Sequence, residues 1–154
     1  MKLKWIFLAL PIFLVACAAP SGKPKPQSWV SDSKNGELVI YRPGSFVFGA
    51  RNVYFYVDGV EVASLGSGTY SLIKLPPGAY RLSQKWDWDM MIKDIEIEIN
   101  VPSKERTYVR LSQLGGEFYG GVLHTTWQLG SVPTDEGLSE IKGLEARAPS
   151  NTSQ

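Results

Sequence analysis

One short stretch decides the fold of this chain: Val53-Tyr54-Phe55-Tyr56-Val57-Asp58-Gly59-Val60-Glu61-Val62-Ala63. Before the Asp-Gly pair, Val and Phe alternate with Tyr, which is the period of a strand with two different faces. A two-residue Asp-Gly link between alternating segments is the strongest short signal for a β-hairpin, because both turn residues need positive φ angles. The stretch therefore predicts two antiparallel strands joined by a tight turn.

The same strand signals continue on both sides of this hairpin. Further strands are predicted at residues 38–41, 70–75, 80–88, 95–101, 107–111 and 122–129. Between two of them, Pro77 and Gly78 predict a type II turn, since Pro presets φ at the second turn position and Gly accepts a positive φ at the third. The strand at 95–101 is the cleanest amphipathic one, with Ile or Val at every second position.

Strands at this spacing indicate a mainly β fold. About seven short strands without strand–helix alternation predict an antiparallel β-sandwich, immunoglobulin-like or prealbumin-like, over residues 37–132. After it, Leu138, Ile141 and Leu144 recur at helical spacing, although two glycines weaken the propensity. The region 133–154 is therefore predicted as a short helix at 135–144 followed by a tail, 146–154, that is disordered.

The first residues have the layout of a bacterial export signal. Lys2 and Lys4 precede an uncharged run from residue 5 to residue 16. The run is shorter than the roughly 20 apolar residues that span a bilayer, and its length suits a signal peptide. Residues 1–16 are therefore predicted to be removed on export.

The signal ends in Leu14-Val15-Ala16-Cys17, which resembles the lipobox of bacterial lipoproteins. The resemblance implies cleavage between Ala16 and Cys17 and transfer of diacylglycerol to the thiol, so that acyl chains hold the protein at a membrane. Residues 17–36, with three prolines and few apolar groups, are predicted to be a flexible tether. In enteric-type bacteria, Ala rather than Asp at position 18 favours the outer membrane. The face of that membrane stays open.

Charge and cysteine content narrow the possible partners. Removing residues 1–16 takes away Lys2 and Lys4 and changes the formal charge from +1 to −1. This balance argues against a nucleic-acid partner and against a polybasic membrane-surface binder. Because Cys17 is the only cysteine, the chain can form no internal disulfide and no cysteine-based metal site, and no cofactor is expected.

Part of the sandwich resembles a family of bacterial lipoproteins known as domain of unknown function 2846. The matching residues are 39–43 (Val-Ile-Tyr-Arg-Pro), 57–59 (Val-Asp-Gly) and 75–80 (Leu-Pro-Pro-Gly-Ala-Tyr), followed by 134–137 (Thr-Asp-Glu-Gly) and Ile141. Some of these turn motifs are shared with prealbumin-like and carboxypeptidase-regulatory-like sandwiches. The resemblance implies a fold and a compartment, and it carries no catalytic residues to transfer.

Several aromatic residues are candidates for binding. Trp86 and Trp88 share one side of a strand and are able to stack on sugar rings or anchor a partner, or else both fill the core. Trp29 either docks on the sandwich or binds a partner. The long link 42–52 carries Phe46 and Phe48, which either insert into a partner or cover an open end of the sandwich.

The sequence offers little for catalysis. The single histidine, His124, lies in a predicted strand, and the sequence contains no Gly-x-Ser-x-Gly motif with a nucleophile that it could activate. His124 is therefore interpreted as an exposed or hydrogen-bonded strand residue. Asp87 and Asp89 share one side of a strand and lack the spacing of a calcium loop. A solvated strand face explains the pair of carboxylates. The glycine-rich segment 115–121 lacks a phosphate-loop Lys and indicates a flexible connection or a β-bulge. No catalytic or metal-binding residue is therefore assigned.

Three functions remain, in order of preference. The first is a non-enzymatic lipoprotein of the cell envelope that binds or supports another envelope component. The second is a module that binds peptidoglycan or a surface glycan, suggested by the paired tryptophans and by analogy of fold. The third is an envelope hydrolase.

Overall fold

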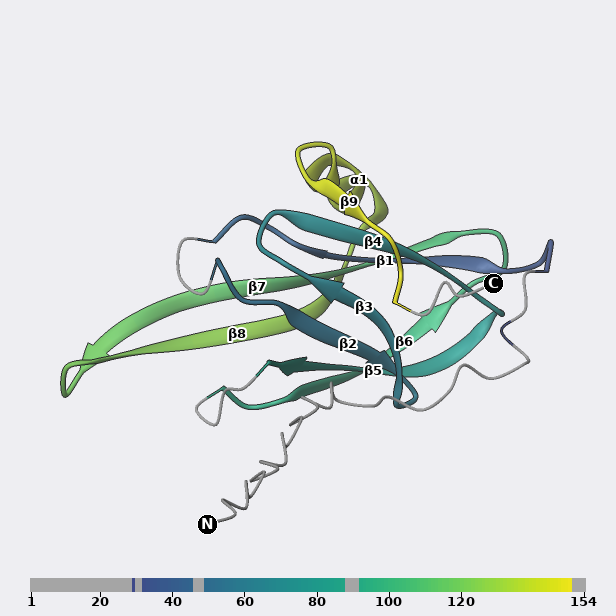
Figure 1. Cartoon of the computed structure of the whole chain (residues 1–154). Coiled ribbons are helices and arrows are strands. Elements are labelled where there is room, and N and C mark those ends of the chain that lie inside the picture. Colours follow the sequence, from purple (N-terminus) through teal and green to yellow (C-terminus); the bar gives the residue numbers. More distant parts are fainter. Residues whose placement is uncertain (1–28, 30–31, 46–48, 88–91, 151–154) are drawn as a thin grey trace, which may run out of the picture.

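The computed structural model describes residues 29, 32–45, 49–87 and 92–150. Within these residues, two sheets pack face to face and a short helix covers the outer side of one of them (Figure 1). The first sheet has the order β8 (Val122–Val132), β7 (Arg106–Tyr119), β1 (Gly36–Arg42), β4 (Thr69–Leu75) and β9 (Glu145–Arg147). The second has the order β3 (Val60–Leu65), β2 (Val53–Val57), β5 (Gly78–Trp86) and β6 (Ile95–Val101). The predicted mainly β sandwich is confirmed.

The hairpin predicted at Asp58-Gly59 joins β2 and β3. The two turn residues have φ angles of 49° and 81°, as such a turn requires. The Asp58 carboxylate accepts a hydrogen bond from the backbone N–H of Arg81 (N to O, 3.0 Å), and the Asp58 N–H donates to the Arg81 carbonyl (2.9 Å). The turn is therefore fixed to β5, which pairs with the other edge of β2.

The main core lies between the two sheets. Every second residue of a strand points inward, because successive side chains leave a strand on opposite faces. On β5, Leu82, Gln84 and Trp86 are buried, so this side of the strand faces the core. On β6, Ile99 and Val101 are buried and the earlier isoleucines pack against the same cluster, as the alternation predicted.

Two strand pairs are parallel, whereas the sequence predicted a purely antiparallel sandwich. β1 pairs with β7 in parallel, from Glu37 opposite Arg106 to Tyr41 opposite Arg110. β4 pairs with β9 in parallel, beginning at Thr69 opposite Glu145. The members of each pair are far apart in the sequence. Turn signals report only the direction of successive strands, so these pairings were not visible in local patterns.

The turn before β5 also differs from its prediction. Gly78 begins β5 and pairs with Val101, and it is not among the residues with a positive φ. The predicted type II turn is therefore wrong. The ladder with β6 requires extended backbone at Gly78, and this tertiary pairing outweighs the local preference of Pro-Gly.

Helix α1 (Thr134–Ile141) is shorter than the predicted segment 135–144 and packs on the outer face of the first sheet. Its buried residue is Gly137, whose backbone lies against the ring of Tyr108. Ile141 and Leu144 pack on the same outer cluster, as predicted, but Leu138 is 42% exposed. Leu138 was predicted to share one side of the helix with these two residues, but it lies outside their cluster.

The segment after the helix is more ordered than the sequence suggested. Residues 145–147 form β9 beside β4, and the N–H of Ser150 donates to the carbonyl of Val62 (2.9 Å). The predicted disorder of 146–154 is thus wrong for residues 146–150, and residues 151–154 lie outside the described part of the chain. Backbone pairing orders a polar segment that has no apolar pattern of its own.

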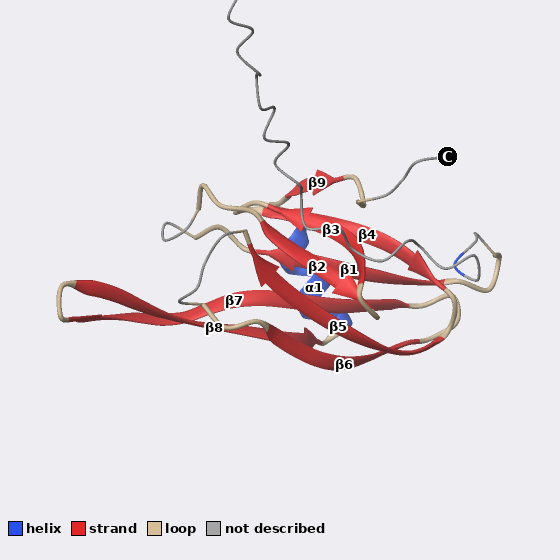
Figure 2. Cartoon of the chain, turned by 60° about the horizontal axis from the view of Figure 1, so that its bottom comes forward, coloured by secondary structure: helices blue, strands red, loops and turns tan. Residues whose placement is uncertain are grey.

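Strands β7 and β8 extend well beyond the body of the sandwich as a two-stranded hairpin (Figures 1 and 2). We call residues 112–126 the arm. Gly120 and Gly121 form its turn, with φ angles of 59° and 80°. The β-bulge predicted in the glycine-rich segment is present as a register shift between Gln113 and Gly115. Residues 115–119 of this segment belong to β7, and Gly120 and Gly121 form the turn to β8.

Candidate functional site

The structure buries two of the five aromatic residues proposed for binding. Trp86 is 8% exposed and lies in the core, which is the core alternative left open by the sequence. Trp29 is 9% exposed and packs edge-on against Tyr80, with ring centroids 6.0 Å apart, so it docks on the sandwich. Neither ring is available to a glycan at the surface. The other three, Trp88, Phe46 and Phe48, lie outside the described residues, as do Ala16 and Cys17.

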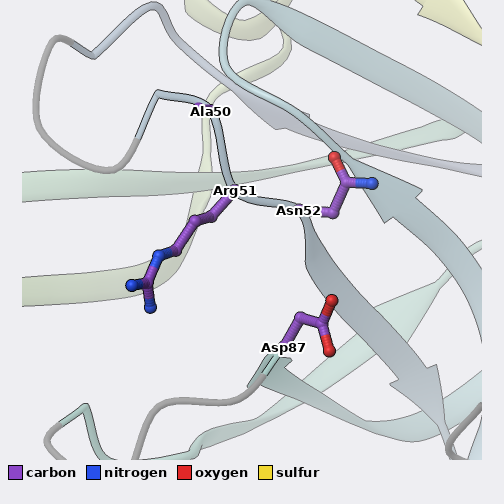
Figure 3. A pocket seen from close by; sticks show the side chains of 4 residues that line it. All are labelled: Ala50, Arg51, Asn52 and Asp87. Carbon is purple, nitrogen blue, oxygen red and sulfur yellow. The ribbon is translucent and has the colours of Figure 1, made fainter. Parts of the chain in front are cut away.

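The loop that contains Phe46 and Phe48 and the loop that contains Trp88 start and end at the same end of the sandwich. Val53, which follows the first loop, pairs with Trp86, which precedes the second. A pocket of about 310 Å³ lies between them and is lined by Ala50, Arg51, Asn52 and Asp87. Figure 3 shows Arg51 and Asp87 bordering this pocket from two different segments. Opposite charges therefore line one small pocket at this end.

Each loop is tied to the body by a buried side chain from the preceding strand. Arg42 donates from Nη1 to the carbonyl of Arg51 (2.6 Å), and Gln84 donates from Nε2 to the carbonyl of Lys93 (3.2 Å). Both bonds join residues nine positions apart. Buried side chains thus close both loops with bonds to backbone carbonyls, and neither bond was foreseen from the sequence.

Arg42 is the centre of this end of the core. Its side chain is fully buried, and its guanidinium carbon lies 5.0 Å from the ring centroid of Trp86 and 5.3 Å from that of Trp127. The two indole rings are 4.8 Å apart at 58°. Burial lowers the pKa of Arg42 to about 10, so the side chain keeps its charge at neutral pH. The guanidinium thus lies beside both tryptophan rings and also donates to Arg51, where the chain approaches β2.

A second pocket, of about 470 Å³, opens at the base of the arm. Its lining consists of Pro43, Gly44, Ser45, the run 111–116 and Trp127. Ser45 donates from its hydroxyl to Oε1 of Gln113 (2.7 Å) and accepts, at its backbone carbonyl, a bond from Ser67 (3.2 Å). The pocket therefore combines an indole wall with hydroxyl and amide groups. We call it the base pocket.

The arm carries the largest exposed apolar side chains of the described residues. Phe118 is 76% exposed, Tyr119 is 81% exposed and Leu114 is 60% exposed. Sequence reasoning missed them because the flanking glycines suggested a loop. His124 is also exposed, opposite Glu117 in the ladder of the arm, which confirms the prediction of an exposed strand residue.

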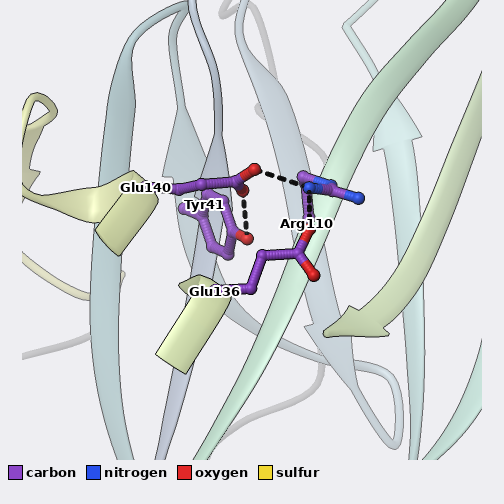
Figure 4. A network of polar contacts seen from close by, with 4 residues as sticks. All are labelled: Tyr41, Arg110, Glu136 and Glu140. Atoms are coloured by element: carbon purple, nitrogen blue, oxygen red, sulfur yellow. Dashed lines mark hydrogen bonds and ion pairs between the residues drawn. The ribbon is translucent and has the colours of Figure 1, made fainter. Parts of the chain in front are cut away.

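A network of hydrogen bonds and ion pairs holds α1 on the first sheet (Figure 4). Arg110 donates from Nη1 to Oε1 of Glu136 (2.7 Å) and to Oε1 of Glu140 (2.6 Å). The Tyr41 hydroxyl donates to the other oxygen of Glu140 (2.6 Å). Burial and this carboxylate raise the pKa of Tyr41 well above its ordinary value. The four groups satisfy one another, so the network explains how the helix is held.

Comparisons with known proteins add no relative. No protein-family model matches the chain, and no curated protein matches its sequence. Across the described residues, no group of three or more His, Cys, Asp or Glu side chains is placed to hold a metal ion. None of the helices among those residues has the length and apolar character needed to cross a bilayer.

Proposed function

We propose that this chain is a lipid-anchored lipoprotein of the bacterial cell envelope that acts without catalysis, by binding a protein partner. The lipobox at 14–17 and the uncharged run before it support the anchor. The resemblance to the lipoprotein family called domain of unknown function 2846 agrees with this compartment. The outer membrane is its proposed location, because Ala18 follows the lipidated Cys17.

The observation that carries the binding function is the exposure of Phe118 and Tyr119 at the end of the arm. Large aromatic side chains dominate the energetics of protein interfaces, and each ring costs free energy when left in water. Here both are more than three-quarters exposed on a hairpin that stands away from the body. A hairpin with apolar side chains at its end is suited to insert into a partner protein.

Trp29, at the end of the tether that meets the body, lies far from the turn of the arm. Trp29 packs on Tyr80, near the start of β5. β5 begins opposite the end of β6 at Val101, and residue 102 lies beside Gly36, the first residue of β1. β1 and β7 run in parallel from this end, so the turn of the arm lies at the opposite end. The arm would therefore meet its partner at the end of the sandwich away from Trp29.

A photo-crosslinking experiment tests this function in cells. A photoreactive phenylalanine analogue at position 118 of the full, tagged chain should yield discrete protein adducts after irradiation of intact envelopes. The matched control places the same analogue at Leu138, another exposed apolar residue that lies on α1. Equal labelling from both positions, or no protein adduct from position 118, would contradict the proposal.

A further inference from the structure

We propose that the partner of the arm is a second copy of this chain: two arms lie side by side in opposite directions, and the end of each fills the base pocket of the other. This inference rests on the proposed function, since it names the protein that the arm binds. It follows from the open edge of β7, from the position and size of the base pocket, and from the charges along the arm.

The open edge lies on the side of β7 that faces away from β8. Among the described residues, β1 pairs with β7 only as far as Arg110, so the backbone of residues 112–119 has no strand beside it on that side. An open strand edge pairs readily with another strand. When two copies of one edge pair in opposite directions, a twofold axis relates them. Each contact then occurs twice, because residue i of either copy contacts residue j of the other.

The register of such a pair is set by symmetry. A twofold axis between Gly115 and Gly116 would place residues 117–119 of one copy beside residues 112–114 of the other. These latter residues line the base pocket. The aromatic end of one arm therefore lies beside the residues that line the pocket of the second copy.

The base pocket has the size and lining to receive an aromatic ring. Its volume is about 470 Å³, and Trp127 forms one wall. A dry cavity of about 150 Å³ is enough to bind benzene. Because successive side chains of a strand point to opposite faces, one of Phe118 and Tyr119 turns toward the pocket and the other covers the reverse face of the paired arms.

Charge and area both fit a pair of identical arms. The arm contains one acidic residue, Glu117, and no Lys or Arg, and the proposed register sets Glu117 against Leu114, so like charges do not meet. Burying Leu114, Phe118 and Tyr119 removes roughly 400 Å² of side-chain surface per copy. With the surfaces that receive them, the total approaches about 1,600 Å², the size of a stable interface.

A lipid surface fits these observations less well than a second copy. The turn of the arm lies at the opposite end of the sandwich from Trp29, where the tether meets the body. Glu117, next to the aromatic pair, would be repelled by anionic headgroups. The base pocket would also have no occupant in that arrangement.

Paired cysteines in the full lipidated chain test the register. One tagged copy carries Leu114→Cys and a differently tagged copy carries Glu117→Cys, and both are expressed together in the bacterial envelope. In the proposed register these positions face each other, within the limit of about 7 Å between Cα atoms for a disulfide. In contrast, the same position in the two copies is offset by three residues along the strands, or about 10 Å by strand rise.

The expected result is a mixed crosslink from co-expression and none from either variant alone. Crosslinking of each single variant with itself would overturn the antiparallel register. Absence of the mixed crosslink after oxidation of the co-expressed variants would overturn the inference.

The mass of the lipidated protein in detergent gives an independent measure of the number of copies in the assembly. The unchanged chain should sediment as two copies, and Phe118→Ser with Tyr119→Ser should sediment as one. Leu138→Ser, the matched control, should leave two copies. A single copy for the unchanged chain would overturn the inference.

The photo-crosslinks from position 118 separate this inference from the proposed function. Adducts to a different envelope protein, without homodimers, would overturn the second copy and leave the binding function standing. Adducts to lipid alone would overturn both.

Discussion

The guanidinium carbon of Arg42 lies 5.0 Å from the ring centroid of Trp86, inside the core and at the end of the strand that leads into the loop 43–52. The same side chain donates to the carbonyl of Arg51 across that loop. A buried cation is costly unless its charge and its donors are satisfied. Arg42 therefore connects the packing of the core with the position of Arg51, near the end of the loop.

Replacing Arg42 should destabilise the sandwich strongly. Arg42→Ala removes the packing against two indole rings and the bond to Arg51, and we expect a loss of about 2–4 kcal/mol in the free energy of unfolding. Arg42→Lys should recover little, because an ammonium lacks the planar fork that stacks and donates together. Urea unfolding followed by tryptophan fluorescence measures both variants.

Arg81→Lys is the matched control for Arg42. Arg81 pairs with Glu96 at 3.2 Å on the surface, with both side chains more than half exposed. Such pairs contribute little, so we expect a change below about 0.5 kcal/mol. Equal losses for Arg42→Lys and Arg81→Lys would contradict the role assigned to Arg42.

The contact between Gly137 and Tyr108 predicts the effect of a methyl group on α1. Gly137→Ala normally favours a helix by up to about 1 kcal/mol, but here the new Cβ would overlap the Tyr108 ring. We expect a net loss of about 1–3 kcal/mol from overpacking. Gly143→Ala, at a site with open space around it, should be neutral or slightly stabilising in the same thermal melt. A stabilising Gly137→Ala would show that the helix does not approach the sheet this closely.

The bond from Tyr41 to Glu140 predicts a pH-dependent stability. At neutral pH, Tyr41→Phe should cost about 1–2 kcal/mol, because the Glu140 carboxylate loses a buried donor. The folded state raises the pKa of Tyr41, so its contribution is complete below about pH 10, the ordinary tyrosine pKa, and is lost as the pH rises above it. The difference in unfolding free energy between the two proteins should therefore shrink above that pH. A constant difference from pH 7 to pH 11 would argue against this coupling.

The hairpin turn gives a prediction about backbone strain. Gly59 has a φ of 81°, which Ala adopts poorly, so Gly59→Ala should cost about 1–2 kcal/mol. Gly130→Ala has an ordinary φ and open space around the new Cβ, and should change stability by less than about 0.5 kcal/mol. Denaturant titration of both variants checks the difference, and similar values would exclude turn strain as the cause.

The lipobox gives a prediction about the anchor. Cys17→Ser removes the only thiol of the chain, so the protein should lose its acyl mass and should no longer partition into the detergent phase. Intact-mass spectrometry and phase separation measure this. Ala18→Asp should keep the acyl mass and, under the enteric sorting rule, move the protein to the inner membrane. An unchanged mass for Cys17→Ser would refute lipidation at this residue.

Local patterns account for much of the fold. The alternation in 53–63 and 95–101 gave the inward face of each strand, and Asp58-Gly59 gave the tight turn between β2 and β3. They failed where pairing partners are distant, as in the parallel pairs β1–β7 and β4–β9. They also failed where a tertiary contact outweighs a propensity, as at Gly78.

The candidate site was less predictable than the fold. Sequence reasoning chose tryptophans and phenylalanines for their chemistry, yet Trp86 and Trp29 are buried. The exposed rings, Phe118 and Tyr119, lie in a segment that looked like a glycine-rich connection. Whether an aromatic ring is covered depends on which strands end nearby, and that information is not local.

By itself, the sequence determined the β character of the chain, its tight hairpin and the signal from which a lipid anchor is proposed, because each depends on residues within a few positions of one another. Only the tertiary structure decided that Arg42 packs against two tryptophan rings, that Gly137 contacts Tyr108 and that the arm extends beyond the end of β1. Those features depend on contacts between segments distant in the chain, where burial and register are settled jointly by the whole fold.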